Sequence, residues 1–218
     1  SHNSPTIAET SRGLITEGLN FYDQGKYADA LKRWKSASKD GSKEADFLLG
    51  FLYDGILQND KEALFFFKKA ALSGHVQAQV NVGIRYEVGD GTDDNYQEAA
   101  FWYSKAAFNQ DSVGQFRLAS LLQRVFKKNE EGHFWFLRSA ELANPDAHLS
   151  LATNFILGRG VKKNLAYAQA ITQTKLLSSG ADDLLEESEK INGDVPVNLF
   201  LLKKLDPFTL GYLIATWE

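Results

Sequence analysis

Cysteine and methionine are both absent from this chain of 218 residues. Without cysteine there is no disulfide framework, no thiolate zinc site, no iron–sulfur cluster and no cysteine nucleophile. The compartment stays open, because cytosolic and periplasmic proteins can both lack cysteine. Because no methionine opens the chain, we expect the start at Ser1 and His2 to result from processing or from a tag, and removal of a signal peptide is compatible with it.

Excess positive charge and long apolar runs are also lacking. The chain has 24 Lys and Arg against 28 Asp and Glu, which gives a formal charge of −4. This balance lacks the electrostatic footprint of general DNA or RNA binding, so nucleic acid is not an expected partner. No apolar run approaches the roughly 18 to 20 residues of a membrane-spanning helix, so we expect no transmembrane segment.

The sequence does contain an internal repeat that is rich in aromatic and small residues. The segment 62–71, Glu-Ala-Leu-Phe-Phe-Phe-Lys-Lys-Ala-Ala, matches 98–107 at an offset of 36 residues, and 131–140 follows 33 residues later. A looser copy occupies 29–37. A small residue placed three or four positions before a large apolar one precedes each copy, as in Leu-Gly-Phe-Leu-Tyr at 49–53. This is helical spacing, so each repeat is predicted to be two helices, called A and B.

Glycine-rich segments mark the predicted turns. Between helices A and B we expect turns at Asp23-Gln24-Gly25, Asp54-Gly55, Gly89-Asp90-Gly91 and Gly158-Arg159-Gly160. The segment from Asp90 to Asn95 resembles a calcium loop superficially. It lacks the glycine and the bidentate glutamate that such a loop requires at its sixth and twelfth positions, so we interpret it as a turn followed by a helix cap.

These residues resemble the Sel1-like repeat (SLR) family, a relative of the tetratricopeptide repeat. The resemblance is carried by a Leu-Gly-x-x-Tyr A helix, a Gly-x-Gly turn and a B helix reading Ala-x-x-Trp-Tyr-x-Lys-Ala-Ala, with 78–107 as the best copy. It covers residues 44–180 well and 12–43 more loosely. It implies an all-α, right-handed superhelical solenoid of about five antiparallel helix pairs with a helical C-terminal extension.

Three segments follow from this interpretation. Residues 1–11 are expected to be disordered or tag-derived, residues 12–180 to form five repeats, and residues 181–218 to form a helical C-terminal cap. The fifth repeat has no sixth repeat to cover it, and the tail supplies apolar side chains of the kind that a cap needs. Docking of the tail onto a partner is the alternative for the same residues.

The resemblance implies a bacterial adaptor without chemistry of its own, which holds one or more partner proteins or peptides on its concave helical surface. No motif indicates a catalytic residue, and the histidines do not have metal-ligand spacing. We therefore predict a protein that is not an enzyme, with no cofactor, no metal and no small-molecule substrate. The alternative is an inhibitor or immunity-type protein that neutralises a partner enzyme by covering its active site.

Counting around each A helix from its small residue gives the positions predicted to face the groove. The residues expected to contact a partner are Tyr22, Phe47, Phe51, Asp54, Val80, Ile84, Glu87, Phe116, Gln123 and Ile156. The wider rows also contain Ile15, Leu19, Ser120, Leu149 and Thr153. An exposed apolar groove commonly marks a binding site, whereas packing against the next repeat is the alternative for any single position.

Overall fold

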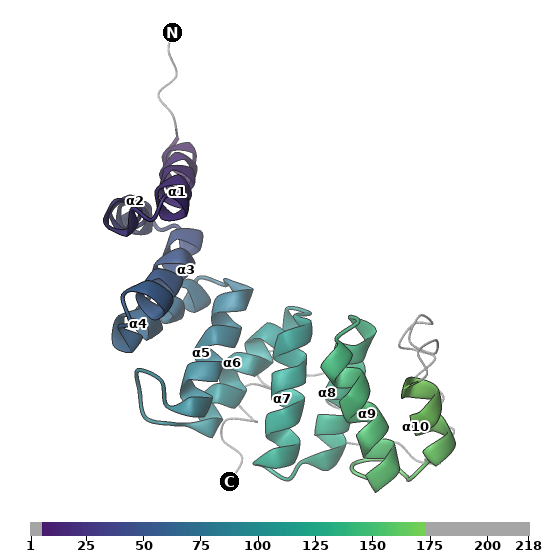
Figure 1. The fold of residues 1–218 in the computed structure, drawn as a ribbon. Helices are drawn as coiled ribbons and strands as arrows, with labels where there is room; N and C mark the ends of the chain where they lie inside the picture. Colours follow the sequence, from purple (N-terminus) through teal and green to yellow (C-terminus); the bar gives the residue numbers. More distant parts are fainter. Residues whose placement is uncertain (1–5, 173–218) are drawn as a thin grey trace. The chain divides into compact units, whose positions relative to one another are not determined.

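The computed structural model describes residues 6–172, and all regular structure in that range is helical (Figure 1). The elements are α1 (Ile7–Asp23), α2 (Tyr27–Lys39), α3 (Lys43–Phe51), the π-helical turn η1 (Leu52–Ile56), α4 (Asp60–Leu72), α5 (Val76–Val88), α6 (Tyr96–Phe108), α7 (Ser112–Arg124), α8 (Asn129–Glu141), α9 (Pro145–Leu157) and α10 (Leu165–Thr172). They follow one another as A and B helices in the predicted order. The all-α fold class is therefore confirmed.

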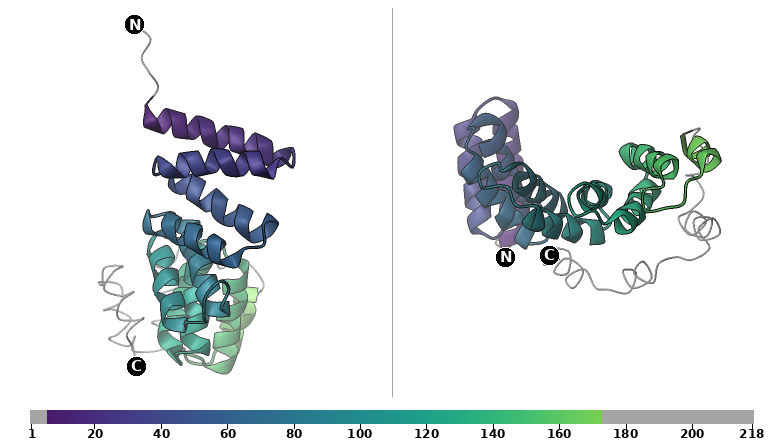
Figure 2. Two further views of the ribbon diagram at one scale, coloured as in Figure 1. Left: turned by 90° about the vertical axis from the view of Figure 1, so that its left-hand side faces the viewer. Right: turned by 90° about the horizontal axis from the view of Figure 1, so that it is seen from below.

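The chain divides into two compact units, residues 1–95 and 96–218, called unit 1 and unit 2. Unit 1 contains α1 to α5, and unit 2 contains α6 to α10. Within each unit a helix packs chiefly against its neighbours in the chain, which Figure 2 shows as an ordered stack. Packing between sequential neighbours is typical of repeat proteins, because one helix pair cannot bury its apolar face alone.

The small residue of the A helix makes room for a ring of the B helix in the first two repeats. Trp34 lies against Gly18, and Phe67 lies against Gly50. A Cβ atom at either glycine would overlap the ring, so a larger residue there would force the ring to move. Trp34 and Phe67 are 2% and 0% exposed. This close contact therefore places a large aromatic side chain in the core.

The turns that follow the B helices α2, α4, α6 and α8 repeat the same backbone geometry. A residue with positive φ is followed by an N-cap whose side chain accepts a hydrogen bond from a backbone amide in the next helix. The positive-φ residues are Gly41, Gly74, Gln110 and Ala143, and the caps are Ser42, His75, Asp111 and Asn144. Two of these four positive-φ residues are not glycine. The packing of the repeat therefore sets this conformation even where the side chain opposes it.

The N-terminal boundary differs from the prediction. Helix α1 begins at Ile7, so residues 7–11 are helical and the expected start of the repeats at residue 12 is too late. The helix starts here because Thr6 and Glu9 form a capping box, in which the Glu9 carboxylate accepts from the Thr6 amide at 2.7 Å. Hydrogen bonds from the backbone and side chain of Thr6 lower the pKa of Glu9. The remaining segment boundaries stay predictions, and the predicted cap at 181–218 lies outside the described residues.

The turn expected at Asp54-Gly55 is also displaced. Both residues lie in η1, where the helix widens before it ends. The positive-φ residue of this turn is Gln58, with φ of 49°. The Gly-x-Gly turns are as predicted, because Gly89 and Gly158 are left-handed C-caps of α5 and α9. The displacement matters because it places the Asp54 carboxylate at the end of an A helix.

Candidate functional site

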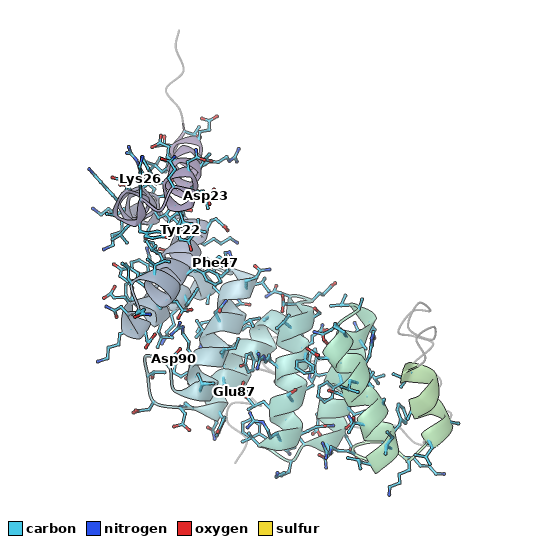
Figure 3. The ribbon with its side chains drawn as sticks, in the orientation of Figure 1. Tyr22, Asp23, Lys26, Phe47, Glu87 and Asp90 are labelled. Carbon is cyan, nitrogen blue, oxygen red and sulfur yellow. The ribbon has the colours of Figure 1, made fainter. Side chains whose placement is uncertain are left out.

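The predicted binding residues of unit 1 lie on three A helices, and several are exposed to solvent. Leu19 and Tyr22 on α1 are 40% and 36% exposed, and Phe51 at the end of α3 is 46% exposed. Ile84 on α5 is half-buried. Figure 3 labels Tyr22 on α1 and Phe47 on α3. These side chains form the A-helix face of unit 1, which we define as Leu19, Tyr22, Phe47, Phe51 and Ile84.

Phe51 is held in place by neighbouring rings although nearly half of it is exposed. Its ring packs edge-on against Phe47 at 4.8 Å and against Phe67 at 5.3 Å between centroids. Phe47 in turn stacks on His75 at 4.0 Å. A rigidly supported, half-exposed aromatic ring loses little conformational entropy when a partner covers it. Phe51 therefore has the properties of a binding anchor.

Two of the predicted binding residues are buried, so they offer little exposed surface to a partner. Val80 on α5 is 7% exposed and Gln123 on α7 is 8% exposed. The Gln123 amide turns inward because its Nε2 donates to the Asn129 carbonyl oxygen at 3.0 Å. Val80 carries a short, branched side chain that does not reach the surface. Helical spacing alone does not distinguish these positions from their exposed counterparts.

A cluster of charged residues that the sequence did not reveal lies at the C-terminal end of α5 in unit 1. The buried Arg85 guanidinium pairs with Asp54, lies 3.1 Å from an Asp90 oxygen, and lies 3.9 Å from an Asp60 oxygen. The predicted site residue Glu87 is half-buried on the last turn of the same helix (Figure 3). The three aspartates offer carboxylate oxygens within 4.8 Å of one another. Arg85 already compensates part of their charge, so we interpret the cluster as an ion-pair network that ties the turns together.

Unit 2 has a hollow of about 700 Å³ on the corresponding helices. It is lined by residues of the A helices α7 and α9 and of α8, among them Phe136 and Leu149. Of the predicted residues Gln123 lines it, and Ser120 and Thr153 of the wider rows do so as well. Its charged lining residues are Arg124, Lys127 and Arg159, which sequence reasoning missed.

The other predicted residues of unit 2 lie outside this lining. Phe116 is half-buried and packs against Phe136 with ring centroids 5.6 Å apart. Ile156 is 47% exposed near the end of α9. Phe116 therefore contacts a lining residue of the hollow, whereas Ile156 is exposed beside Leu157, which is 51% exposed.

Unit 1 also has a hollow, which has a volume of about 800 Å³ and lies beside helix α1. Ile15 of the wider rows lines it together with residues of the turn between α2 and α3. Its charged lining residues are Arg12, Lys43, Asp40 and Glu44, so both signs are represented. This mixed lining favours no particular charge on a ligand.

His133 on α8 is the described residue whose ionisation is most strongly perturbed. Burial lowers its pKa from 6.5 to about 4, so the ring is neutral near pH 7. Its Nδ1 accepts from the Asn154 amide at 3.3 Å. The ring also packs edge-on against Phe155 at 5.3 Å. These contacts make His133 a core residue.

Comparison with known proteins identifies the family of this chain. A family model for the Sel1 repeat matches residues 43–75, 76–107 and 112–144. The crystal structure of a Sel1 repeat protein from Oxalobacter formigenes is 30% identical, with a TM-score of 0.65 over 72% of this chain and 67% of that chain. The chain belongs to the Sel1 repeat family. The family and the fold class predicted from the sequence are thus confirmed.

Two further relatives differ in how much of them this chain covers. The structure of c5321, a protective antigen present in uropathogenic Escherichia coli strains, has an SLR fold; it is 21% identical, with a TM-score of 0.62 over 90% of this chain and 48% of that chain. The chitin synthase regulator SKT5 of Saccharomyces cerevisiae is 32% identical over 125 residues, which is 55% of this chain and 18% of the regulator. The chain spans 36% or less of the length of the first curated relatives that it matches.

Proposed function

We propose that this Sel1 repeat chain is a non-catalytic scaffold that binds a partner protein through the exposed side chains of its A helices. The observation that carries the proposal is the A-helix face of unit 1. Phe51 presents an exposed ring that Phe47 and Phe67 support. Exposed aromatic anchors of this kind are enriched at the centres of protein interfaces.

The comparisons support a role in binding and regulation. One relative is named as a regulator of chitin synthase, which is a protein that acts on another protein's activity. No helix between residues 6 and 172 is long and apolar enough to cross a membrane. The proposal concerns the face of the repeats and does not extend to the activity of the longer relatives.

The experiment that tests the proposal compares an exposed phenylalanine of an A helix with an exposed phenylalanine of a B helix. Full-length chain carrying Phe51→Ala or Phe65→Ala is used to capture partners from cells of the native organism. Phe51 lies on an A helix and is 46% exposed, whereas Phe65 lies on the B helix α4 and is 59% exposed. We expect Phe51→Ala to lower the recovery of a specific partner by at least about tenfold, as for a hot-spot residue.

The Phe65→Ala chain is the control for the loss of an exposed phenylalanine outside the A helices. It should recover the same partner as the unaltered chain, because Phe65 lies on the B helix α4 and its ring contacts Phe66 of the same helix. Circular dichroism of both variants verifies that the fold is intact. Equal recovery by the Phe51→Ala chain, or selective loss with Phe65→Ala, contradicts the assignment of the binding face.

A further inference from the structure

We propose that the hollow of unit 2 binds an extended acidic peptide segment. Its Asp or Glu carboxylates pair with Arg124, Lys127 and Arg159, and a large apolar side chain of the peptide packs on Leu149. The inference rests on the proposed protein-binding function and specifies the chemistry of one partner segment. It concerns unit 2 alone, whereas the A-helix face defined above belongs to unit 1.

The charge of the lining is the first observation. Arg124, Lys127 and Arg159 all line the hollow, and none of its other lining residues is acidic. The whole chain carries a formal charge of −4, so a lining with three cations and no carboxylate runs against the balance of the molecule. A concave, positively charged surface attracts negative ligands and accelerates their association.

The second observation is how these cations are held. The Lys127 ammonium donates to the Arg124 carbonyl oxygen at 2.8 Å, which leaves two of its protons for a ligand. The Arg124 guanidinium lies over the Tyr96 ring at 5.9 Å. Within residues 6–172, neither Lys127 nor Arg159 forms an ion pair. The contrast is with Arg85 of unit 1, whose charge three aspartates already compensate.

The remaining lining fits a peptide. Leu149 is 65% exposed and offers an apolar surface beside the cations. The Thr153 hydroxyl donates to the Leu149 carbonyl oxygen at 2.9 Å, so its oxygen is oriented to accept from a peptide amide. The volume of about 700 Å³ lies within the roughly 300 to 1,000 Å³ that is typical of ligand pockets. Phe136, the aromatic lining residue, is 4% exposed, so no ring face is open for stacking a nucleobase.

The experiment is fluorescence anisotropy on the full chain with a fluorescein-labelled peptide of repeated Glu-Leu-Gly units. Peptides of Gln-Leu-Gly and Lys-Leu-Gly are the matched controls. We expect the Glu peptide to bind with a Kd below about 1 mM, and the two controls to bind at least about tenfold more weakly. Raising NaCl from about 50 mM to about 500 mM should weaken binding, because screening shortens the reach of the exposed charges.

A charge-reversal variant locates the site. Lys127→Glu combined with Arg159→Glu should raise the Kd of the Glu peptide by at least about tenfold. The control is Lys39→Glu combined with Lys61→Glu, which makes the same change in net charge at exposed lysines of unit 1. The control should leave the Kd within about twofold, because its charges lie outside the hollow. Far-UV circular dichroism verifies the helical fold of both variants.

Several results would overturn the inference. They are a Kd above about 1 mM for the Glu peptide, equal binding of the Gln peptide, or equal weakening by both charge-reversal variants. Tighter binding of inorganic phosphate or of an oligothymidylate than of the Glu peptide would assign the hollow to phosphate groups instead. Loss of peptide binding while Phe51-dependent capture persists overturns this inference alone. The converse result overturns the proposed function of the A-helix face alone.

Discussion

The two units of the chain share their internal packing and differ in what they present to a partner. Phe47 meets Phe67 at 5.9 Å in unit 1, and Phe116 meets Phe136 at 5.6 Å at the equivalent positions of unit 2. One helical turn further along, Phe51 is exposed in unit 1, whereas unit 2 has the half-buried Ser120. The repeat therefore fixes which side chains pack together and leaves the chemistry of the A-helix surface free to vary.

The same contrast holds for charge. Arg85 of unit 1 and Asn154 of unit 2 occupy equivalent positions, and both side chains are buried. Arg85 is compensated by carboxylates of the turns, whereas Asn154 bonds to the neutral His133. The cations of unit 2 lie instead around a hollow without acidic lining residues. One unit thus offers an apolar anchor, and the other offers a positively charged hollow.

The largest expected effect tests whether the internal packing is equivalent in the two units. Phe67→Ala and Phe136→Ala should each lower the free energy of unfolding by about 3 to 5 kcal/mol, because each removes a buried ring and leaves a cavity. Urea unfolding followed by circular dichroism measures both. Phe65→Ala, at an exposed ring, is the control and should cost about 1 kcal/mol or less. If Phe136→Ala lowered the free energy of unfolding by no more than Phe65→Ala does, the internal packing of the two units would not be equivalent.

The second effect is a pH dependence of stability that arises from His133 of unit 2. Between pH 6.5 and about 4 the unfolded His133 binds a proton that the folded chain excludes, so stability falls as the pH is lowered through this window. Above pH 6.5 the ring is neutral in both states, and no stability is lost. The shift corresponds to about 3 kcal/mol at the lower end of the window.

A substitution taken from unit 1 tests this assignment. Leu64 occupies the position of His133 in the second repeat, so His133→Leu should flatten the fall in stability between pH 6.5 and 4. His148→Asn controls for the loss of a histidine elsewhere in unit 2. Thermal melts across the pH range measure both variants. An unchanged acid dependence in the His133→Leu chain would refute buried neutral His133 as its source.

The third effect concerns the turn between helices A and B. Gly91 has positive φ, and a Cβ atom there would collide with the Asp60 backbone. Gly160 has the same conformation against the Asn129 backbone in unit 2. We expect Gly91→Ala and Gly160→Ala to cost about 2 kcal/mol each. Gly25 also has positive φ, but a Cβ atom there would meet no neighbouring atom, so Gly25→Ala should lower the free energy of unfolding by only about 1 kcal/mol. Equal losses of stability at all three positions would show that the collision does not contribute.

The smallest effect concerns the caps after the B helices. Ser42 accepts from the Ala45 amide at 3.2 Å in unit 1, and Asp111 accepts from the Gly114 amide at 2.7 Å in unit 2. Ser42→Ala and Asp111→Ala should each lower the unfolding free energy by about 1 kcal/mol. Replacement by Asn should restore most of it, since Asn also caps helices. A failure of Asn to rescue either variant would separate the effect from capping.

The helices and turns could be predicted because their signals are local. The small residues, the aromatic triplets and the Gly-x-Gly turns each act within one helix pair, so the repeat alone identifies them. The exposure of the A-helix face could not be predicted in this way. Phe47 and Val80 occupy equivalent positions, yet Val80 is buried because its shorter side chain ends below the surface.

The charged features were missed for a different reason. Arg85 is a charged residue in a predicted helix, and the sequence carries no sign that aspartates of two turns converge on it. The cations of the unit 2 hollow come from the last residue of α7 and from two separate turns. Only the folded backbone brings Arg124, Lys127 and Arg159 to one place. A search for cations at the ends of A helices would have found part of this set.

Hydrogen exchange of the full chain with and without its captured partner tests the central claim most directly, because it reports on A and B helices in one measurement. The account predicts that the partner slows exchange in α1 and α3 and leaves α4, with its exposed Phe65, unchanged. Addition of the Glu-Leu-Gly peptide should slow exchange in α7 and α9. Protection confined to the B helices α2, α4 and α8 would contradict the assignment of the A helices as the binding face.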